Sequence, residues 1–215
     1  MARWLMSFMP RGPVPGPRLT VIRHHRVYGE AERYPTDETL LPRPYSPYGV
    51  TKLAGEHLAL LYARNFGTPA VALRYFTVYG PRQRPDMAFH RFCRAMLAGE
   101  PITVYGDGRQ SRDFTFIADA IEGNMRAWRS PKAEGVYNVG GGSQIEVLEA
   151  IAILEEALGV KAALRFEPMQ PGDPLRTRAD ASRIRADFGF VPSVAIRQGL
   201  AAEAEWARGL YARKG

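Results

Sequence analysis

The sequence predicts an α/β fold, and three observations lead to this class. Apolar runs of strand length alternate along the chain with amphipathic segments of helix length, which is the pattern of α/β proteins. The run AVALRYFTVYG at 70–80 is apolar almost throughout, as expected of a strand in a parallel sheet that is covered on both faces. The composition is that of a globular protein, with 46% hydrophobic and 24% charged residues in a chain of 215.

The first third of the chain is predicted to hold a short strand, a long loop and one helix. Residues 1–18 are rich in proline and glycine and predict an irregular arm, which is followed by a strand at 19–22 and a proline-broken loop at 30–47. A helix is expected to begin near Pro47, because proline is favoured in a first helical turn, and to end at Gly67. Its expected apolar stripe is formed by Leu53, Leu58, Leu61 and Tyr62.

Helices and strands continue to alternate after the strand at 70–80. Asp86 is the expected N-cap of a helix that ends just before Gly99. Ser143 and Glu146 form a capping-box pattern, which predicts that another helix begins there. The other helices are expected at 117–130, 180–188 and 195–213, and the other strands at 102–105, 135–139 and 163–168.

The charge balance is basic and depends on arginine. The net charge is +7, and only four of the 29 basic residues are lysine, which leaves 25 arginines. The arginines are scattered, with no run of five or more, so the pattern does not predict a nucleic-acid-binding surface. Because a guanidinium matches phosphate with two parallel hydrogen bonds, a small anionic ligand explains the excess better.

The sequence predicts a cytoplasmic protein without a metal site or a membrane anchor. The chain has no apolar run of about 18 residues, and its start does not have the pattern of a cleaved signal peptide. Cys93 is the only cysteine, so an internal disulfide is excluded, which fits a reducing compartment. His24 and His25 are adjacent, would point to opposite faces of a strand, and have no further ligand motif.

The stretch SPYGVTKLAGEHL at 46–58 carries the clearest chemical signal. Tyr48 and Lys52 are four residues apart, so on a helix they share one face. A nearby ammonium favours the phenolate form of a tyrosine, which can then take a proton from an alcohol. The lysine can also donate a hydrogen bond to the ribose of a nicotinamide cofactor. The alternative is that Tyr48 packs on the core and Lys52 is a solvated helix charge.

Several further stretches, together with SPYGVTKLAGEHL, make the sequence similar to a known family. They are VYGE, LRYFTVYGPRQRPDMAFHRF, ITVYGDGRQSRDFTFIADAIEG, YNVGGG and PGDPLRTRAD, and they extend over roughly residues 27 to 210. The chain resembles the extended short-chain dehydrogenase/reductases that act on nucleotide sugars, the NAD-dependent epimerases and dehydratases. The stretch RYFTVYGPRQRPDMA most resembles the branch that acts on UDP-glucuronate and related UDP-hexoses.

The resemblance implies a fold and a division of labour along the chain. The fold would hold the C-terminal strands of a Rossmann-like parallel sheet and a smaller α/β substrate-binding subdomain. Residues 1–26 would be the irregular arm, and 27–80 the remnant of the NAD-binding domain with the Tyr48–Lys52 helix. Residues 81–215 would mainly bind the nucleotide sugar. The resemblance also implies a homodimer through the Tyr48–Lys52 helix.

The resemblance also implies roles for individual residues. Tyr48 and Lys52 would be catalytic, and with Tyr75 they would contact NAD. A UDP-sugar would be held by Thr77, Arg84, Met87, Arg112, Asp173 and Arg176. Two arginines on one diphosphate are chemically reasonable, because each makes charge-assisted, bidentate contacts.

Two departures from the family pattern leave two functions open. The glycine-rich turn that binds the cofactor diphosphate is not found, and RHHR at 23–26 stands where the family usually has Ser or Thr. These departures predict a truncated NAD-dependent UDP-sugar epimerase, or alternatively a non-catalytic module that binds a UDP-sugar or a partner. Without the first strands of the sheet, Val71, Ala72 and Leu73 are expected to be partly uncovered.

Overall fold

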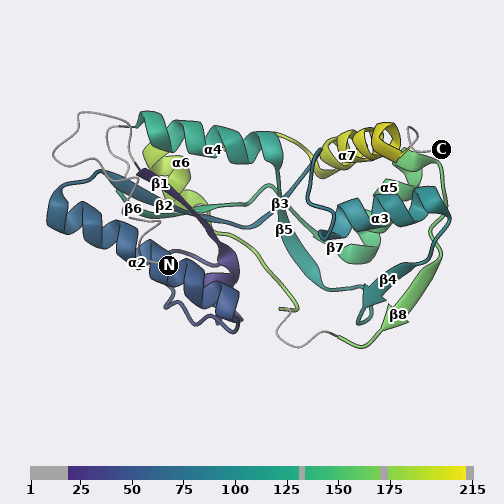
Figure 1. Ribbon diagram of the computed structural model, residues 1–215, viewed down its shortest axis with the longest axis horizontal. Coiled ribbons are helices and arrows are strands. Elements are labelled where there is room, and N and C mark those ends of the chain that lie inside the picture. The colour runs from purple at the N-terminus through teal and green to yellow at the C-terminus, as the bar shows by residue number, and fades with distance from the viewer. Residues whose placement is uncertain (1–18, 131–133, 170–173, 212–215) are drawn as a thin grey trace.

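The computed structural model describes residues 19–130, 134–169 and 174–211, and of residues 19–25 it describes the backbone alone. The described chain is elongated and has two lobes (Figure 1). In the first lobe a parallel sheet lies between helix α2 on one face and helices α4 and α6 on the other. In the second lobe helices α3, α5 and α7 pack together above two short strands, β4 and β8.

The sheet of the first lobe has the strand order β1-β2-β6. Its strands are β1 (Leu19–His24), β2 (Ala70–Tyr75) and β6 (Gly135–Val139), and both pairings are parallel. All six residues of the central strand β2 are buried, and Val71, Ala72 and Leu73 are 0% exposed. The expectation that these three would be partly uncovered is therefore wrong. Strands on both edges and helices on both faces cover them.

Helix α2 (Pro47–Phe66) begins and ends as expected. The Ser46 hydroxyl accepts a hydrogen bond from the Gly49 N–H at 3.1 Å, and Gly67 closes the helix in the left-handed conformation, with φ 63°. The buried face, however, consists of Gly49, Glu56 and Ala59. Small residues let the helix approach the sheet closely.

The expected apolar stripe of α2 is only partly correct. Leu53 packs beside Val27 and Phe76 in a small core, but Leu58 is 42% and Leu61 51% exposed. The periodicity of leucines therefore marks a solvent-facing surface of the helix as well as its packed side.

A buried ion pair joins α2 to the sheet. Arg74 donates from Nε to Glu56 at 2.9 Å and from a terminal nitrogen at 2.6 Å, and both side chains are buried. The Tyr28 ring lies over the Arg74 guanidinium at 4.7 Å, and the Tyr28 hydroxyl donates to Asn138 on β6 at 2.7 Å. This chain of contacts connects α2, β2, β6 and the short 3-10 helix η1 (His25–Tyr28).

The second lobe contains short strand pairs and three helices. The strands β3 (Thr77–Tyr79) and β5 (Ser111–Phe116) pair in parallel, and β7 (Ser143–Glu146) pairs antiparallel with β5. The pair β4 (Ile102–Tyr105) and β8 (Leu164–Glu167) is parallel. The helices are α3 (Ala88–Ala98), α5 (Val147–Leu158) and α7 (Ile196–Tyr211), and they enclose the largest core cluster.

Two expected helix starts are wrong. Met87, and not Asp86, is the N-cap residue of α3, and it makes no side-chain capping bond. Ser143 does not begin a helix, because residues 143–146 form β7 and the helix α5 begins at Val147. The capping-box pattern was misleading because pairing with β5 takes up the backbone groups of this segment. The strand β5 itself was not predicted.

The chain returns to the first lobe after it has built part of the second. Helix α4 (Ile117–Arg129), strand β6 and helix α6 (Ser182–Phe188) all belong with the first sheet. The chain therefore leaves the first sheet near residue 80 and returns to it at α4. Within the part of the chain that the structure describes, no helix combines the length and apolar character needed to cross a membrane.

Replacing Glu56 by leucine is expected to lower the free energy of unfolding by about 3–5 kcal/mol, because the Arg74 charge would stay buried without its partner. Urea denaturation followed by circular dichroism measures this change. Glu122→Leu is the control, because its ion pair with Arg126 is exposed and is expected to be worth at most about 0.5 kcal/mol. A Glu56→Leu variant as stable as Glu122→Leu would contradict the prediction. The double variant Glu56→Leu/Arg74→Met is expected to recover most of the loss.

Candidate active site

A pocket of about 950 Å³ lies between the two lobes. The first lobe contributes the start of α2 and the end of β2, and the second contributes β3, the loop 80–87, α3, β4 and β5. Among the sequence-predicted site residues, the lining includes Tyr48, Lys52, Tyr75, Thr77, Arg84, Met87 and Arg112. Residues distant in sequence therefore meet in one cavity.

Tyr48 and Lys52 lie on the first turns of α2 at the edge of this pocket. The Lys52 ammonium is 5.1 Å from the centre of the Tyr48 ring, and the Tyr48 side chain is 47% exposed. Their shared helix face is as predicted from the four-residue spacing. Gly49, between them, is packed so closely against η1 that a Cβ there would lie 2.8 Å from the Arg26 carbonyl oxygen. This contact fixes the start of α2 against the segment that precedes it.

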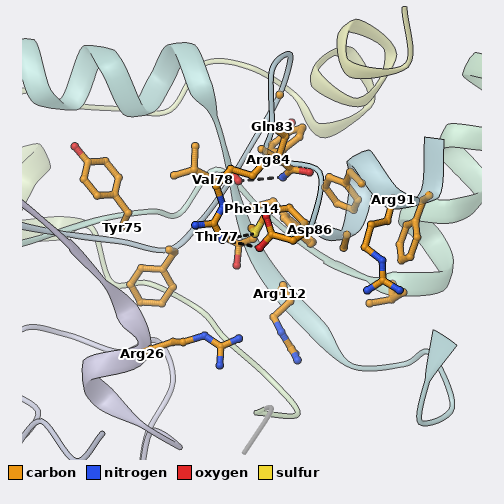
Figure 2. A pocket seen from close by; sticks show the side chains of 18 of the residues that line it. Arg26, Tyr75, Thr77, Val78, Gln83, Arg84, Asp86, Arg91, Arg112 and Phe114 are labelled. Carbon is orange, nitrogen blue, oxygen red and sulfur yellow. Dashed lines mark hydrogen bonds and ion pairs between the residues drawn. The ribbon is translucent and has the colours of Figure 1, made fainter. Parts of the chain in front are cut away.

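Tyr75 and Thr77 mark the change from β2 to β3 at the pocket wall. Figure 2 shows Thr77 in the middle of the labelled side chains, whereas the Tyr75 ring points away from them. The Tyr75 side chain belongs to the core cluster of the first lobe, and burial raises its pKa. A contact between Tyr75 and a ligand would thus involve parts of the residue other than its hydroxyl.

The loop 80–87 carries Arg84 and Met87 into the pocket and is held by polar anchors. The Gly80 N–H donates to Glu203 at 2.9 Å. The Gln83 side chain donates to the Val78 carbonyl at 3.2 Å and accepts from the His90 N–H at 3.1 Å. Arg82, with φ 68°, has a backbone conformation that is costly for a residue with a side chain. The loop is therefore held in a specific shape.

Arg84 forms an exposed ion pair with Asp86 at 2.8 Å, and its guanidinium also approaches the Met87 sulfur at 3.9 Å. Figure 2 shows Arg84, Arg26 and Arg112 arranged around Thr77. An exposed ion pair is worth little in water, so an incoming anion can compete with Asp86 for the arginine at small cost.

Arg112 is presented by β5, and the next residue anchors this strand. Asp113 is buried and accepts hydrogen bonds from the Gly141 N–H at 3.0 Å and the Ala179 N–H at 2.8 Å. Burial raises the pKa of Asp113 to about 6, and the two backbone donors oppose that shift. Asp113 thereby joins β5 to the turn after β6 and to the segment 174–179, and it holds the Arg112 backbone at the pocket wall.

Of the last two predicted site residues, the structure describes only Arg176, which is not part of the pocket lining. Asp173 lies outside the described residues. Arg176 is exposed, forms an isolated bridge with Ser111, and stacks on the Tyr34 ring at 5.5 Å. Arg176 is therefore paired with Ser111, the residue that precedes Arg112 on β5. Its role in ligand binding stays a prediction.

Many lining residues were not predicted, and three of these are basic. Arg26, Arg82 and Arg91 join Arg84, Arg112 and Lys52 in the lining, and Asp86 is the one acidic lining residue in the described part of the chain. Arg26 lies in the stretch RHHR, where the family resemblance suggested only a missing Ser or Thr. The arginine excess of the whole chain was the available signal. A cavity with this balance favours a ligand that carries at least two negative charges.

Comparisons with known proteins show which family the chain belongs to. The model of the NAD dependent epimerase/dehydratase family matches residues 5–140, more than half of the chain. The chain belongs to this family. The match begins at residue 5, so the expectation that family similarity starts near residue 27 is wrong. The predicted α/β class with a Rossmann-like parallel sheet is confirmed by solved members of the family.

Similar proteins and solved structures include epimerases of UDP-sugars. A Bacillus subtilis (strain 168) protein named uncharacterized UDP-glucose epimerase YtcB is 44% identical over 86% of this chain and 58% of its own length. The crystal structure of UDP-glucuronic acid 4-epimerase from Bacillus cereus, in complex with UDP-glucuronic acid and NAD, is 46% identical with a TM-score of 0.86. The match covers 90% of this chain and 62% of the Bacillus cereus chain.

A third comparison shows the same pattern at lower identity. UDP-glucose 4-epimerase from Thermus thermophilus, solved with NAD, is 33% identical with a TM-score of 0.82, over 89% of this chain and 64% of its own. The chain thus spans about three fifths of the length of these epimerases. NAD is bound in these solved neighbours, which supports it as the cofactor of the family.

Proposed function

We propose that this chain carries the nucleotide-sugar site and the catalytic tyrosine–lysine pair of an NAD-dependent UDP-hexose or UDP-glucuronate 4-epimerase. The observation that carries the proposal is the presence of Tyr48 and Lys52 in the same pocket as Arg84 and Arg112. A proton acceptor for a sugar hydroxyl and two cations for a diphosphate are thereby within one cavity, as the reaction requires.

The arginines account for binding of the nucleotide end. Arg112 from β5 and Arg84 from the loop 80–87 can each donate to a diphosphate through two nitrogens, and Arg82 and Arg91 add positive charge nearby. Met87 offers an apolar surface beside them. Thr77, on β3 in the same pocket, has a hydroxyl suited to a sugar oxygen or a phosphate oxygen. The sugar would then lie at the Tyr48 end of the pocket.

Proton transfer is assigned to the first turns of α2. The Tyr48 phenolate oxygen takes the proton of the sugar 4-hydroxyl, and the Lys52 ammonium stabilises the phenolate. The proton returns to the sugar oxygen after the C4 carbon has been reduced from its other face. Because oxidation and reduction cancel, the overall reaction is an isomerisation.

The donors on α2 also fit one end of NAD. The Lys52 ammonium and the Tyr48 hydroxyl suit the ribose next to the nicotinamide ring, and both line the pocket with Tyr75. NAD, when bound, supplies the hydride acceptor for C4 and then returns the hydride.

The alternative function is a module that binds a UDP-sugar without turning it over. It is favoured by the presence of Arg26 in the pocket, in a stretch where the family pattern has Ser or Thr. Both functions require UDP-sugar binding, so binding tests them together and turnover separates them.

Calorimetric titration of the purified chain with UDP-glucuronate, in the absence of NAD, is the first test. Saturable binding is expected, and Arg112→Gln is expected to weaken it by about tenfold or more, since one charge-assisted contact is worth about 1.5–3 kcal/mol. Arg109→Gln is the control, because Arg109 is exposed, lies in the neighbouring turn, and is not part of the pocket lining. Equal effects of the two substitutions, or no binding to the unmodified chain, would refute the proposed site.

Turnover is tested by incubating the chain with UDP-glucuronate and NAD and separating the two epimers by chromatography. Tyr48→Phe is expected to reduce the rate by about 10²–10⁴-fold while the dissociation constant for UDP-glucuronate stays unchanged, because the lost group acts in proton transfer. If the unmodified chain binds UDP-glucuronate but forms no epimer, the binding module is the correct function.

A homodimer through α2 is part of this proposal. Val50, Leu58 and Leu61 are exposed on one side of the helix, opposite its buried face, and form an apolar surface that a second copy can cover. Sedimentation velocity at micromolar concentration is expected to show a dimer. Leu61→Asp should weaken the dimer by about tenfold or more, equivalent to about 1.4 kcal/mol, because it would bury a carboxylate.

The matched control for the dimer is Leu41→Asp, an exposed leucine outside α2. This substitution is expected to leave the dimer unchanged. A monomer for the unmodified chain, or a dimer that resists Leu61→Asp, would show that α2 is not the interface.

A further inference from the structure

Glu203 on α7 is a buried carboxyl group close to the pocket, although it does not line it. Its side chain is 0% exposed. One oxygen accepts the Gly80 N–H at 2.9 Å, and the other, Oε1, has no hydrogen-bond partner among the residues that the structure describes. Burial raises the pKa of Glu203 to about 7, and the hydrogen bond from Gly80 opposes this shift. A glutamate with a half-satisfied carboxyl group is costly in a core and calls for a reason.

The hydrogen bond from Gly80 connects the Glu203 carboxyl group to the pocket. Gly80 is the first residue of the loop 80–87, immediately after β3, which carries Thr77. Gln83 anchors the middle of the loop and the start of α3, so Glu203 is the anchor at its first residue. This loop carries Arg84 and Met87, which are part of the proposed nucleotide-binding site together with Arg112 on β5. A change at Glu203 therefore reaches the pocket through the backbone of this loop.

Helix α7 is itself closely packed against β3. A Cβ on Gly199 would lie 2.1 Å from the Tyr79 hydroxyl oxygen, so the tyrosine lies directly over the glycine. Gly199 is one helical turn before Glu203 on the same helix. This contact determines the distance between α7 and β3, so the Glu203 carboxyl group has a fixed position relative to Gly80.

Other titratable groups lie around Glu203 on the elements that pack against it. Tyr79 on β3 and Cys93 on α3 face it, and burial raises the pKa of both, to about 12 for Cys93. Asp119 on α4 is near Tyr79, and its carboxylate accepts from the Ser193 and Val194 N–H groups at 3.0 and 3.1 Å. His90 on α3 also contacts the loop 80–87, through the Gln83 carbonyl at 2.6 Å, and contacts Trp206 and Tyr211 on α7. A variant at Glu203 itself is therefore needed to assign a pH dependence to this carboxyl group.

We propose that Glu203 is a positioning residue for the nucleotide-sugar site: its ionised carboxylate holds Gly80, and with it the loop 80–87, in the arrangement that binds a UDP-sugar. A charged acceptor makes a hydrogen bond about twice as strong as a neutral one. Protonation of Glu203 weakens the anchor, loosens the loop and lowers the affinity for the diphosphate. This inference rests on the proposed function and adds a pH dependence to it.

Ionisation of Glu203 and binding of the ligand affect each other. If the ionised form binds the ligand more tightly, ligand binding must favour ionisation and release a proton. The test is calorimetric titration with UDP-glucose, whose phosphate groups stay fully ionised between pH 5.5 and 8.5. The unmodified chain is expected to bind about tenfold more tightly at pH 8 than at pH 6, within the usual range of such couplings. At pH 7, the binding enthalpy should depend on the buffer in the sense of proton release.

Glu203→Gln is the informative variant, because glutamine resembles the protonated acid in shape and charge. It is expected to bind UDP-glucose at all pH values as weakly as the unmodified chain does at pH 6, without proton release. Asp119→Asn is the control, since Asp119 is also a buried carboxylate with backbone donors but does not contact the loop 80–87. This control should retain the pH dependence.

Stability and affinity that change in opposite directions give a readout that a purely structural role would not produce. The pKa of Glu203 is raised in the folded chain, so the folded state binds the proton more tightly than the unfolded state. The contribution of this group to stability is therefore fully present below about pH 4.5 and is lost as the pH rises through about 7. Relative to the unmodified chain, Glu203→Gln should thus gain thermal stability as the pH rises from 5 to 8 while it loses relative affinity.

The outcomes separate this inference from the function on which it rests. Binding of UDP-glucose that does not change with pH, or that keeps the same pH dependence in Glu203→Gln, overturns the role of Glu203 and leaves the proposed function intact. Stability and affinity of Glu203→Gln that fall together at pH 8 also overturn it, because they indicate a structural defect. No binding of UDP-glucose or UDP-glucuronate by the unmodified chain at any pH overturns both.

Discussion

The bidentate ion pair between Glu56 and Arg74 is the interaction on which the geometry of the pocket depends. It joins the middle of α2 to the central strand of the first sheet, and Tyr28 and Asn138 extend it to η1 and β6. Rotation or sliding of the helix would separate two charges that are out of contact with water, which is strongly unfavourable. Lys52 and Tyr48 precede Glu56 by one and two turns on this helix, so their position at the pocket follows from the ion pair.

Irregular segments around the site are held by the same physical means. Glu203 accepts the N–H of Gly80, and Asp113 accepts those of Gly141 and Ala179. Each carboxyl group is buried and serves backbone groups outside the strand ladders, which would otherwise be unsatisfied. The proposed diphosphate-binding residues lie on or beside these segments. Buried acids therefore position surface cations here, although the acids themselves need not contact the ligand.

Local sequence patterns predicted those elements whose ends and character are determined by their own residues. The start and end of α2 follow from Ser46, Pro47 and Gly67, and β2 follows from its apolar run. The strand β5 was not predicted because Arg112 and Asp113 interrupt its apolar pattern, and its ladder partners lie far along the chain. The exposed leucines of α2 were misassigned because the burial of Glu56 depends on Arg74, which the helix sequence alone does not contain. The four-residue spacing predicted the Tyr48–Lys52 pair, whereas the basic lining with Arg26 and Arg91 depends on tertiary contacts between segments.

The packing of Gly199 under the Tyr79 hydroxyl has a consequence for how this sequence can evolve. The tyrosine occupies the space of a Cβ, since both its hydroxyl oxygen and the adjacent ring carbon lie within 2.7 Å of that position. Phenylalanine at 79 would still leave the ring carbon in the way, so removing the hydroxyl alone does not open position 199 to a larger residue. A larger residue at 199 therefore requires a smaller side chain at 79. Natural variants with a side chain larger than glycine at 199 should carry a smaller residue at 79, which would make this helix–strand contact visible as covariation.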